Sequence, residues 1–296
     1  MTPRVDSSAG TGRDGGAAAV PLAPPLPLRA VLLLVAKLAL VFGSSVAAAL
    51  ALCRFLVQSV REHDAAAGLA TSKLDHLSVR SFSSLEELQR SRATFEHIFA
   101  LEFPLALLCF SCVYVLKQTF AIPGSALLNL FAGAMLPFRL AFPLVATLTA
   151  CGASCCFLLS RHLASEQLVA GICQRVLPGQ LPRLRRQIED AKETGQLPYL
   201  LLFLRVFPFS PNWFLNMASP WLQVPLTLFT PSVLVGLLPY NFLTVHAGAM
   251  LSTLRSTSDM LDPRTLGSLV LLALGMLVPA VLKRKQSKAS SDRKAD

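Results

Sequence analysis

Charged side chains are scarce in this chain, and their scarcity excludes an ordinary soluble domain. Only 15% of the 296 residues are charged, whereas 53% are hydrophobic. Soluble globular domains carry about a quarter charged residues. Acidic residues are the rarer sign, with 17 Asp and Glu against 27 Lys and Arg, which gives a net charge of +10. The composition therefore indicates an integral membrane protein whose excess positive charge is unevenly placed along the chain.

The chain also lacks the short motifs that mark common catalytic and nucleotide-binding sites. No P-loop, GxSxG, HExxH or GxGxxG stands in a context that supports such a site. Cys109 and Cys112 have CxxC spacing, but the apolar runs that hold most of the seven cysteines carry no histidine or acidic neighbour. We interpret these cysteines as small packing residues. The sequence therefore predicts no metal site, no cofactor, no enzymatic activity and no nucleic-acid partner.

Long apolar runs dominate the chain, and five of them are predicted to cross a membrane. The first, Leu28–Leu52, has about 25 residues, enough for a hydrocarbon core of about 30 Å. A tilted or peripheral helix is the alternative there, because Lys37 interrupts the run. The other four predicted spans are Phe95–Leu116, Leu140–Ser160, Leu226–Met250 and Leu266–Leu282. Residues 1–27 are rich in Gly, Ala, Ser and Pro, and we expect them to form a disordered tail.

A broken apolar stretch, Tyr199–Pro225, is the most distinctive part of the sequence. Arg205 lies within its apolar run, Pro208 and Pro211 interrupt the backbone soon afterwards, and two asparagines follow. Prolines at this density remove internal hydrogen bonds that a helix in lipid requires. Irregular backbone at membrane depth persists only where protein or a water-filled cavity surrounds it. The stretch therefore predicts a helix that enters the membrane, turns and returns.

A second stretch, Phe120–Pro143, repeats this pattern. Pro123–Gly124 breaks the chain, and Asn129 follows six residues after the proline. In the later stretch, Asn216 follows five residues after Pro211, so the two patterns agree to about one residue. Paired interrupted segments in two halves are the sequence signal of an inverted-repeat membrane protein with its site at the midplane. We expect two facing re-entrant hairpins, and two proline-kinked spans in contact are the alternative.

Two titratable residues fall within predicted spans. Glu102 lies near the end of its span, which favours an interfacial carboxylate over a buried functional one. His246 has no acidic residue near it in the sequence and is expected to be a hydrogen-bonded packing residue.

The polar segment 161–196 is predicted to contain an amphipathic helix that lies on the membrane. Leu181, Leu184 and Ile188 recur at helical spacing, which would place them on one apolar face. The basic cluster 183–186 is either a solvated face or a surface that attracts anionic lipid.

Three sequence blocks, FAIPGSALLNLFAG, CGASCCFLLS and FLRVFPFSPNWFLN, resemble the DedA/VTT superfamily. The match is closest to its eukaryotic branch, the transmembrane protein 41 family, and more distant to vacuole membrane protein 1. The resemblance covers roughly residues 95–285. It implies an all-α polytopic membrane protein with about five full spans and two facing re-entrant hairpins. It also implies residence in the endoplasmic reticulum membrane and phospholipid scrambling linked to autophagy, lipoproteins and lipid droplets.

The resemblance assigns roles to individual residues of this chain. The family's intramembrane arginine corresponds to Arg205, the first hairpin tip to Pro123–Ser125 and the second to Pro208–Asn216. Many bacterial members, which are tied to polyprenyl-phosphate carriers, have glutamate directly after the Pro-Gly pair, where this chain has Ser125. The missing carboxylate weakens the case for proton-coupled transport.

The leading hypothesis is an energy-independent phospholipid scramblase. The facing hairpins would form a polar notch lined by Ser125, Asn129, Asn212 and Asn216, through which a headgroup slides while its acyl chains stay in lipid. Arg205 would contact the phosphate, because a guanidinium fork matches its geometry, or would be satisfied by carbonyls at the hairpin ends.

Two other functions remain open at the level of sequence. A proton-coupled transporter of a small or lipid-linked anion would need a midplane carboxylate, for which Glu102 is the candidate. A non-catalytic scaffold would bind partners through its basic loops and tail. Membrane phospholipids are the expected partners, and a homo-oligomer or other membrane proteins are further candidates.

The arrangement in the chain predicts four regions and one orientation. Residues 1–27 are the tail, 28–94 the first span and a polar loop, 95–285 the membrane domain, and 286–296 a basic polar tail. With five spans, most lysines and arginines fall on the side that holds the C-terminal tail. Cytoplasmic loops carry this excess, so we expect that tail in the cytosol and the N-terminus in the lumen. If the first run does not cross, or the second hairpin does, both ends become cytosolic.

Overall fold

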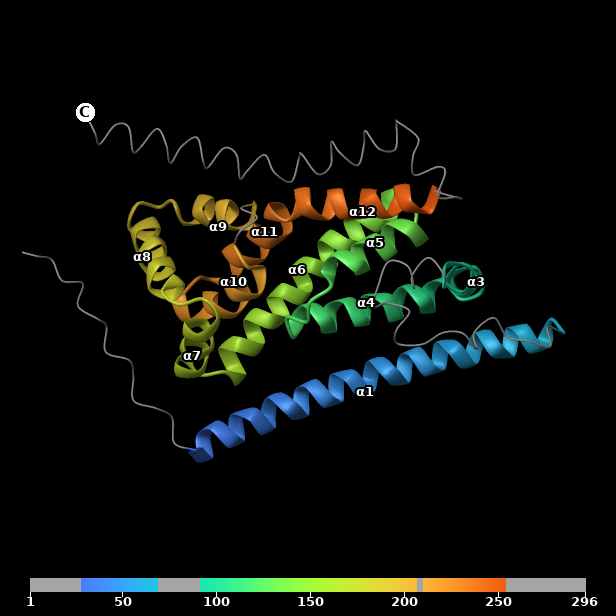
Figure 1. The fold of residues 1–296 in the computed structure, drawn as a ribbon, viewed down its shortest axis with the longest axis horizontal. Coiled ribbons are helices and arrows are strands. Elements are labelled where there is room, and N and C mark those ends of the chain that lie inside the picture. The colour runs from blue at the N-terminus through green and yellow to red at the C-terminus, as the bar shows by residue number, and fades with distance from the viewer. Residues whose placement is uncertain (1–27, 69–90, 207–209, 254–296) are drawn as a thin grey trace, which may run out of the picture.

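The computed structural model describes residues 28–68, 91–206 and 210–253, and every regular element in these ranges is a helix (Figure 1). The all-α architecture expected from the sequence is therefore confirmed. The helices are α1 (Leu28–Ala66), α3 (Arg92–Leu101), α4 (Phe103–Thr119), α5 (Ser125–Met135), α6 (Phe138–Leu163), α7 (Glu166–Val176), α8 (Gln180–Glu193), α9 (Leu197–Val206), α10 (Asn212–Ala218), α11 (Leu226–Gly236) and α12 (Leu238–Thr253), with a short 3₁₀ helix at Ser219–Leu222.

Three helical segments of the described chain are long and apolar enough to cross a membrane. They are Val31–Ala66, Phe138–Leu163 and Leu226–Met250. The last is divided at Leu237 into α11 and α12. The fifth predicted span, Leu266–Leu282, lies outside the described residues, as do both tails.

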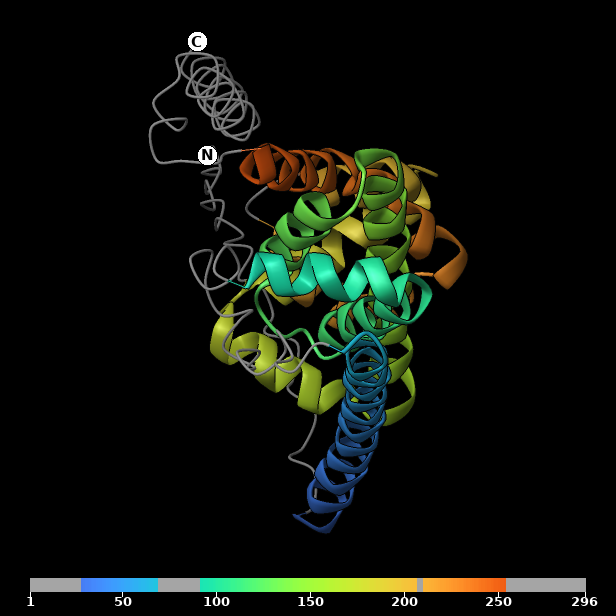
Figure 2. The same cartoon turned by 90° about the vertical axis from the view of Figure 1, so that its right-hand side faces the viewer.

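The first two predicted spans differ in extent from the observed helices. Helix α1 continues beyond Leu52 to Ala66, through the start of the segment expected to be a loop. It lies on the outside of the protein beneath α4 (Figures 1 and 2), with many apolar side chains exposed, as suits contact with lipid. The second predicted span is broken at Glu102 into α3 and α4, because Pro104 cannot donate a backbone hydrogen bond and instead begins a new helix.

The first hairpin arises where α4 ends and the backbone turns back. Ala121 and Gly124 have φ of 53° and 107°, a left-handed conformation that glycine adopts without strain. Helix α5 follows with 11 residues, or about 16 Å of helix, and is therefore too short to cross a bilayer alone. Pro137 then begins α6.

The second hairpin has the same sequence of parts. Helix α9 ends at Val206, residues 207–209 lie outside the described chain, and α10 begins after Pro211 with only 7 residues. The predicted break residue Pro208 is among the undescribed residues. After the 3₁₀ helix, Gln223 adopts a φ of 53° and Pro225 begins α11.

Helix α6 lies at the centre and packs against α4, α10, α11 and α12. Its first half contributes Val145 to one apolar core, shared with α1, α3, α4, α5 and α12. Its second half contributes Phe157 to another, shared with α7 to α11. Small residues of α6 allow neighbouring helices to approach closely, because a Cβ at Gly152 would collide with the side chain of Gln118.

Helices α5 and α12 lie side by side, although more than 100 residues separate them in the chain (Figure 1). Their backbones are in direct contact, since a Cβ at Gly133 would overlap the carbonyl oxygen of Val245 and a Cβ at Gly248 that of Leu130. Such close approach gives helices in lipid the van der Waals contact that holds them together.

The amphipathic helix predicted on the membrane surface is α8, but its apolar face packs on the protein. Leu184 and Ile188 are buried in the core that contains Leu201 and Phe214. Arg185 pairs with Glu166 of α7, and Arg183 is exposed. The predicted apolar face of this helix is present, but the face packs on other helices of the protein.

Candidate functional site

A cavity of about 190 Å³ lies where the two helix breaks meet. Ser125 at the start of α5 lines it, and so do Asn212 and Asn216 of α10. The remaining lining residues come from α4, the turn after it, α6, α10, the residue between α11 and α12, and α12: Tyr114, Lys117, Gln118, Ala121, Ile122, Pro123, Thr149, Trp213, Leu237, Tyr240 and Asn241. The two hairpin tips thus share one polar cavity.

The intramembrane arginine is held inside the protein and does not line this cavity. Arg205 is 4% exposed, and its Nη1 donates to Asn212 Oδ1 at 3.1 Å and to the Asn212 backbone oxygen at 3.5 Å. Its Cζ lies 4.9 Å from the centroid of the Phe229 ring, within the range of a cation–π contact. A Cβ at Gly236 would collide with the Arg205 side chain, so α11 fits closely against this residue.

The contact with Arg205 determines which way the Asn212 amide faces. A guanidinium can only donate hydrogen bonds, so the atom that faces Arg205 must be the oxygen. The Nδ2 group, which can only donate, is then the part of this amide left for a ligand. The Arg205 Nη2 group has no hydrogen-bond partner among the described residues but is buried, so a direct contact with a phosphate would require Arg205 or the residues around it to move.

Asn129 lies one hydrogen bond behind the cavity wall. It is 0% exposed, accepts from Tyr114 at 2.9 Å, and donates to Thr244 at 2.8 Å and to Asn241 at 3.2 Å. Tyr114 also hydrogen-bonds Thr149 of α6 at 2.8 Å. Buried polar groups in lipid need such partners, and this network joins α4, α5, α6 and α12.

Among the other predicted residues, Pro123, Ser125 and Asn216 line the cavity. Pro123 and Ser125 line its first-hairpin side, and Gly124 between them adopts the left-handed turn. Asn216 lines the opposite side, is 2% exposed, and its Oδ1 has no hydrogen-bond partner among the described residues. Pro211 forms the start of α10.

Sequence reasoning missed several lining residues, of which Lys117 is the most informative. It directly follows the predicted span Phe95–Leu116, yet it is 7% exposed and lines the cavity. Its place six residues before Pro123 was the available signal. Trp213 and Tyr240 were also missed, because aromatic residues near a helix break are common at any membrane interface.

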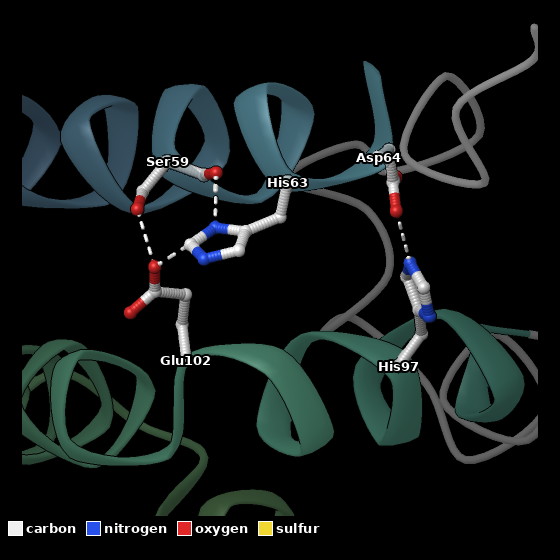
Figure 3. Close-up of polar contacts among 5 residues, drawn as sticks. All are labelled: Ser59, His63, Asp64, His97 and Glu102. Atoms are coloured by element: carbon white, nitrogen blue, oxygen red, sulfur yellow. Dashed lines mark hydrogen bonds and ion pairs between the residues drawn. The ribbon is translucent and has the colours of Figure 1, made fainter. Parts of the chain in front are cut away.

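The titratable residues Glu102 and His246 lie away from the cavity lining. Figure 3 shows Glu102 accepting a hydrogen bond from Ser59 of α1, with His63 Nδ1 3.3 Å from the same carboxylate oxygen. Nearby, His97 and Asp64 pair at 2.8 Å, so two histidine–carboxylate pairs fasten α1 to α3 and the start of α4.

His246 packs with aromatic rings, as expected for a packing residue. Its ring centroid lies 5.7 Å from that of Phe242 and 5.8 Å from that of Phe138.

Comparison with known proteins places this chain within one family. The VTT domain family matches residues 122–250, from the first helix break to α12. An uncharacterized membrane protein of Arabidopsis thaliana is 36% identical over 208 residues, which are 70% of this chain and 69% of that protein. Transmembrane protein 41B of Xenopus laevis is 31% identical over 218 residues, which are 73% of this chain and 75% of that protein.

Transmembrane protein 41B of Homo sapiens is 34% identical over 179 residues, which are 60% of this chain and 59% of that protein. The matched segments therefore span between 59% and 75% of these three relatives. No solved structure matches the chain.

Proposed function

Because this chain belongs to the transmembrane protein 41 family of VTT-domain membrane proteins, we propose that it moves phospholipids between the leaflets of the endoplasmic reticulum membrane without an energy source. The observation that carries the proposal is the polar cavity shared by the two hairpin tips. We further propose that this activity supports autophagy, as the resemblance to the family implies.

The cavity addresses the main barrier to lipid flipping. A zwitterionic headgroup that enters hydrocarbon loses its water, and unpaired charges in such a medium cost many kcal/mol. Ser125, Asn212 and Asn216 supply polar groups at the broken helix ends, where an uninterrupted span would present apolar side chains. With a volume of about 190 Å³, the cavity exceeds the roughly 30 Å³ that one water occupies in the liquid. The acyl chains would remain in the surrounding lipid.

Residues behind the lining hold the polar groups in position. Arg205 fixes the Asn212 amide, and Asn129 ties α5 to α12 behind the wall of the cavity. We therefore assign Ser125, Asn212 and Asn216 to the headgroup, and Arg205 and Asn129 to the frame that positions them. A proton-coupled transporter is less well supported, because the described part of the cavity lining contains no carboxylate and Glu102 is engaged with Ser59.

Reconstitution tests the proposal directly. The purified full-length chain is placed in liposomes that contain a fluorescent phospholipid in both leaflets, and a membrane-impermeant reductant is added outside. A scramblase lets the reductant bleach the label of both leaflets without any gradient. Empty liposomes and liposomes with an unrelated polytopic helical protein serve as controls. Bleaching of the outer leaflet alone contradicts the proposal, and lipid or anion uptake that needs a proton gradient supports the transporter.

A further inference from the structure

Lys117 places a buried cation at the cavity, and no carboxylate of the described residues balances it. It lies in the last turn of α4 and is 7% exposed. Within the described residues, no carboxylate lies within ion-pair distance of its ammonium and no side-chain hydrogen bond is formed by it. A charged group in a low-dielectric setting is costly unless an opposite charge or hydrogen-bonding groups meet it. The cavity that Lys117 lines is where such a partner would bind.

The polar groups around Lys117 favour an anion. Asn212 offers Nδ2, since its oxygen is held by Arg205, and Gln118 also brings an amide to the lining. Ser125 and Tyr240 add hydroxyl groups that donate as well as accept. A cation with these donors beside it, and with no acidic group in the described lining, matches a tetrahedral oxyanion, while the unpartnered Asn216 Oδ1 is an acceptor left for a donor group of the ligand or a water.

A lysine suits a phosphate that must pass through a site and leave it again. Its ammonium is a compact point charge on a flexible stem, whereas arginine holds phosphate in a fixed two-point fork. A conducting site has to bind its cargo well enough to admit it and weakly enough to release it. Arg205, packed under Phe229 and bonded to Asn212, has the opposite character of a fixed structural cation.

We propose that Lys117 binds the phosphate of a phospholipid headgroup in the cavity, and that Arg205 is a positioning residue that presents Asn212 to the same phosphate. This inference rests on the proposed function, from which it takes its ligand. Lys117 lies outside the residues that the VTT domain family matches, which begin at Ile122.

Another role is open to a lysine at this place, and the test must separate the two. The last turn of a helix carries partial negative charge, and a lysine there stabilises the helix modestly. In that role, replacing Lys117 would lower stability slightly and leave ligand affinity unchanged. If Lys117 binds phosphate, replacing it should instead weaken ligand affinity, with little loss of stability.

The binding measurement uses a reporter that the cavity already contains. Trp213 lines the cavity, while the other tryptophan, Trp221, hydrogen-bonds Ser160 at 3.0 Å. In a Trp221→Phe background, Trp213 fluorescence is titrated with dihexanoyl phosphatidylcholine in a phosphate-free nonionic detergent. Lys117→Gln is expected to weaken the affinity about tenfold or more, as for a lost charge-assisted hydrogen bond. Lys117→Arg should retain most of it.

Control variants and probes make the result specific. Lys37→Gln, the same change at an exposed lysine of α1, should leave the affinity unchanged. Glycerophosphocholine and inorganic phosphate test for a free anion as the ligand, and dihexanoylglycerol tests for binding of the acyl chains alone. If inorganic phosphate binds as tightly as the lipid, or dihexanoylglycerol does, assignment to a phospholipid headgroup is wrong. Circular dichroism and thermal unfolding establish that each variant is folded.

The two proposals fail in different ways. If the wild-type chain scrambles lipid and Lys117→Gln binds and scrambles as wild type does, the role of Lys117 is refuted and the scramblase stands. If the wild-type chain does not scramble but binds the short lipid in a Lys117-dependent manner, the scramblase is refuted and the phosphate site stands. If the folded wild-type chain shows no lipid-dependent change at Trp213, the Lys117 site is refuted whatever the flipping assay shows.

Discussion

Arg205 and Asn212 are joined across the break of the second hairpin by a hydrogen bond of 3.1 Å from Nη1 to Oδ1. The bond connects the end of α9 with the start of α10, so one side chain fixes both the hairpin and the amide that faces the cavity. The sequence suggested that Arg205 contacts the phosphate or is satisfied by carbonyls. The structure makes Arg205 a candidate for the residue that orients Asn212 toward a ligand.

Arg205→Leu should leave the protein in the membrane and reduce flipping about tenfold or more, because Asn212 loses the partner that orients it. Arg205→Lys should recover little, since an ammonium lacks the planar fork. Asn212→Leu should have a similar effect, and the double variant should lose much less than the sum, as expected for two residues that act through one contact. Flipping in liposomes at matched protein density measures this, with Arg183→Leu on the exposed face of α8 as the control. If Arg205→Leu flips lipid at the wild-type rate, Arg205 does not position Asn212 for flipping.

Asn129→Leu should destabilise the protein by about 1–3 kcal/mol, because the change leaves buried polar partners on α4 and α12 without one of their hydrogen bonds. Thermal unfolding in detergent is the measurement. Thr147→Val, at an exposed hydroxyl that bonds only to its own helix, should have little effect. Equal stability of the two variants would show that the network does not support the fold.

Gly133→Val should separate α5 from α12, since any Cβ at this position overlaps the backbone at Val245. Overpacking typically costs about 1–3 kcal/mol, and a clash with backbone belongs at or above the upper end of this range. Gly171→Val in α7 is the matched control, because a Cβ there meets open space. Yield and monodispersity after detergent extraction report the outcome, and a Gly133→Val protein that behaves like Gly171→Val would contradict the close packing.

Ser125→Cys and Asn216→Cys should react with a membrane-impermeant thiol reagent if water fills the cavity. The native cysteines are replaced first. Ser125 is partly exposed and Asn216 is 2% exposed, so labelling should be faster at position 125. Asn129→Cys is the control, because this fully buried position lies behind the wall and should not react. No reaction at 125 and 216, while a terminal cysteine does react, would rule out a water-filled notch.

A tag at the C-terminus should be digested by protease in sealed microsomes, because the excess of lysine and arginine predicts a cytosolic C-terminus. A tag at the N-terminus should be protected if all five predicted spans cross. Detergent should expose both tags to the protease. Survival of the C-terminal tag until detergent is added would reverse the orientation.

The positions of the helix breaks could be predicted from the sequence because they depend on local backbone chemistry. Pro123, Gly124 and Pro211 alter hydrogen bonding and φ within a few residues of themselves, whatever the rest of the chain does. Apolar length similarly indicated membrane helices, although α1 extends further than its apolar run and Glu102 divides a predicted span. The periodicity of α8 predicted a face, but could not say whether lipid or protein covers it.

Tertiary structure decided which residues line the cavity. Lys117 and Asn212 are far apart in the chain, and they line one cavity only because α6 holds the two halves together. The same packing places Asn129 against Asn241 and Thr244, and so puts it behind the wall that it was expected to line. The sequence determined where this chain breaks and which polar residues flank the breaks, because these are local properties. Which of those residues meet a ligand, and which position the others, depends on contacts between helices more than 100 residues apart.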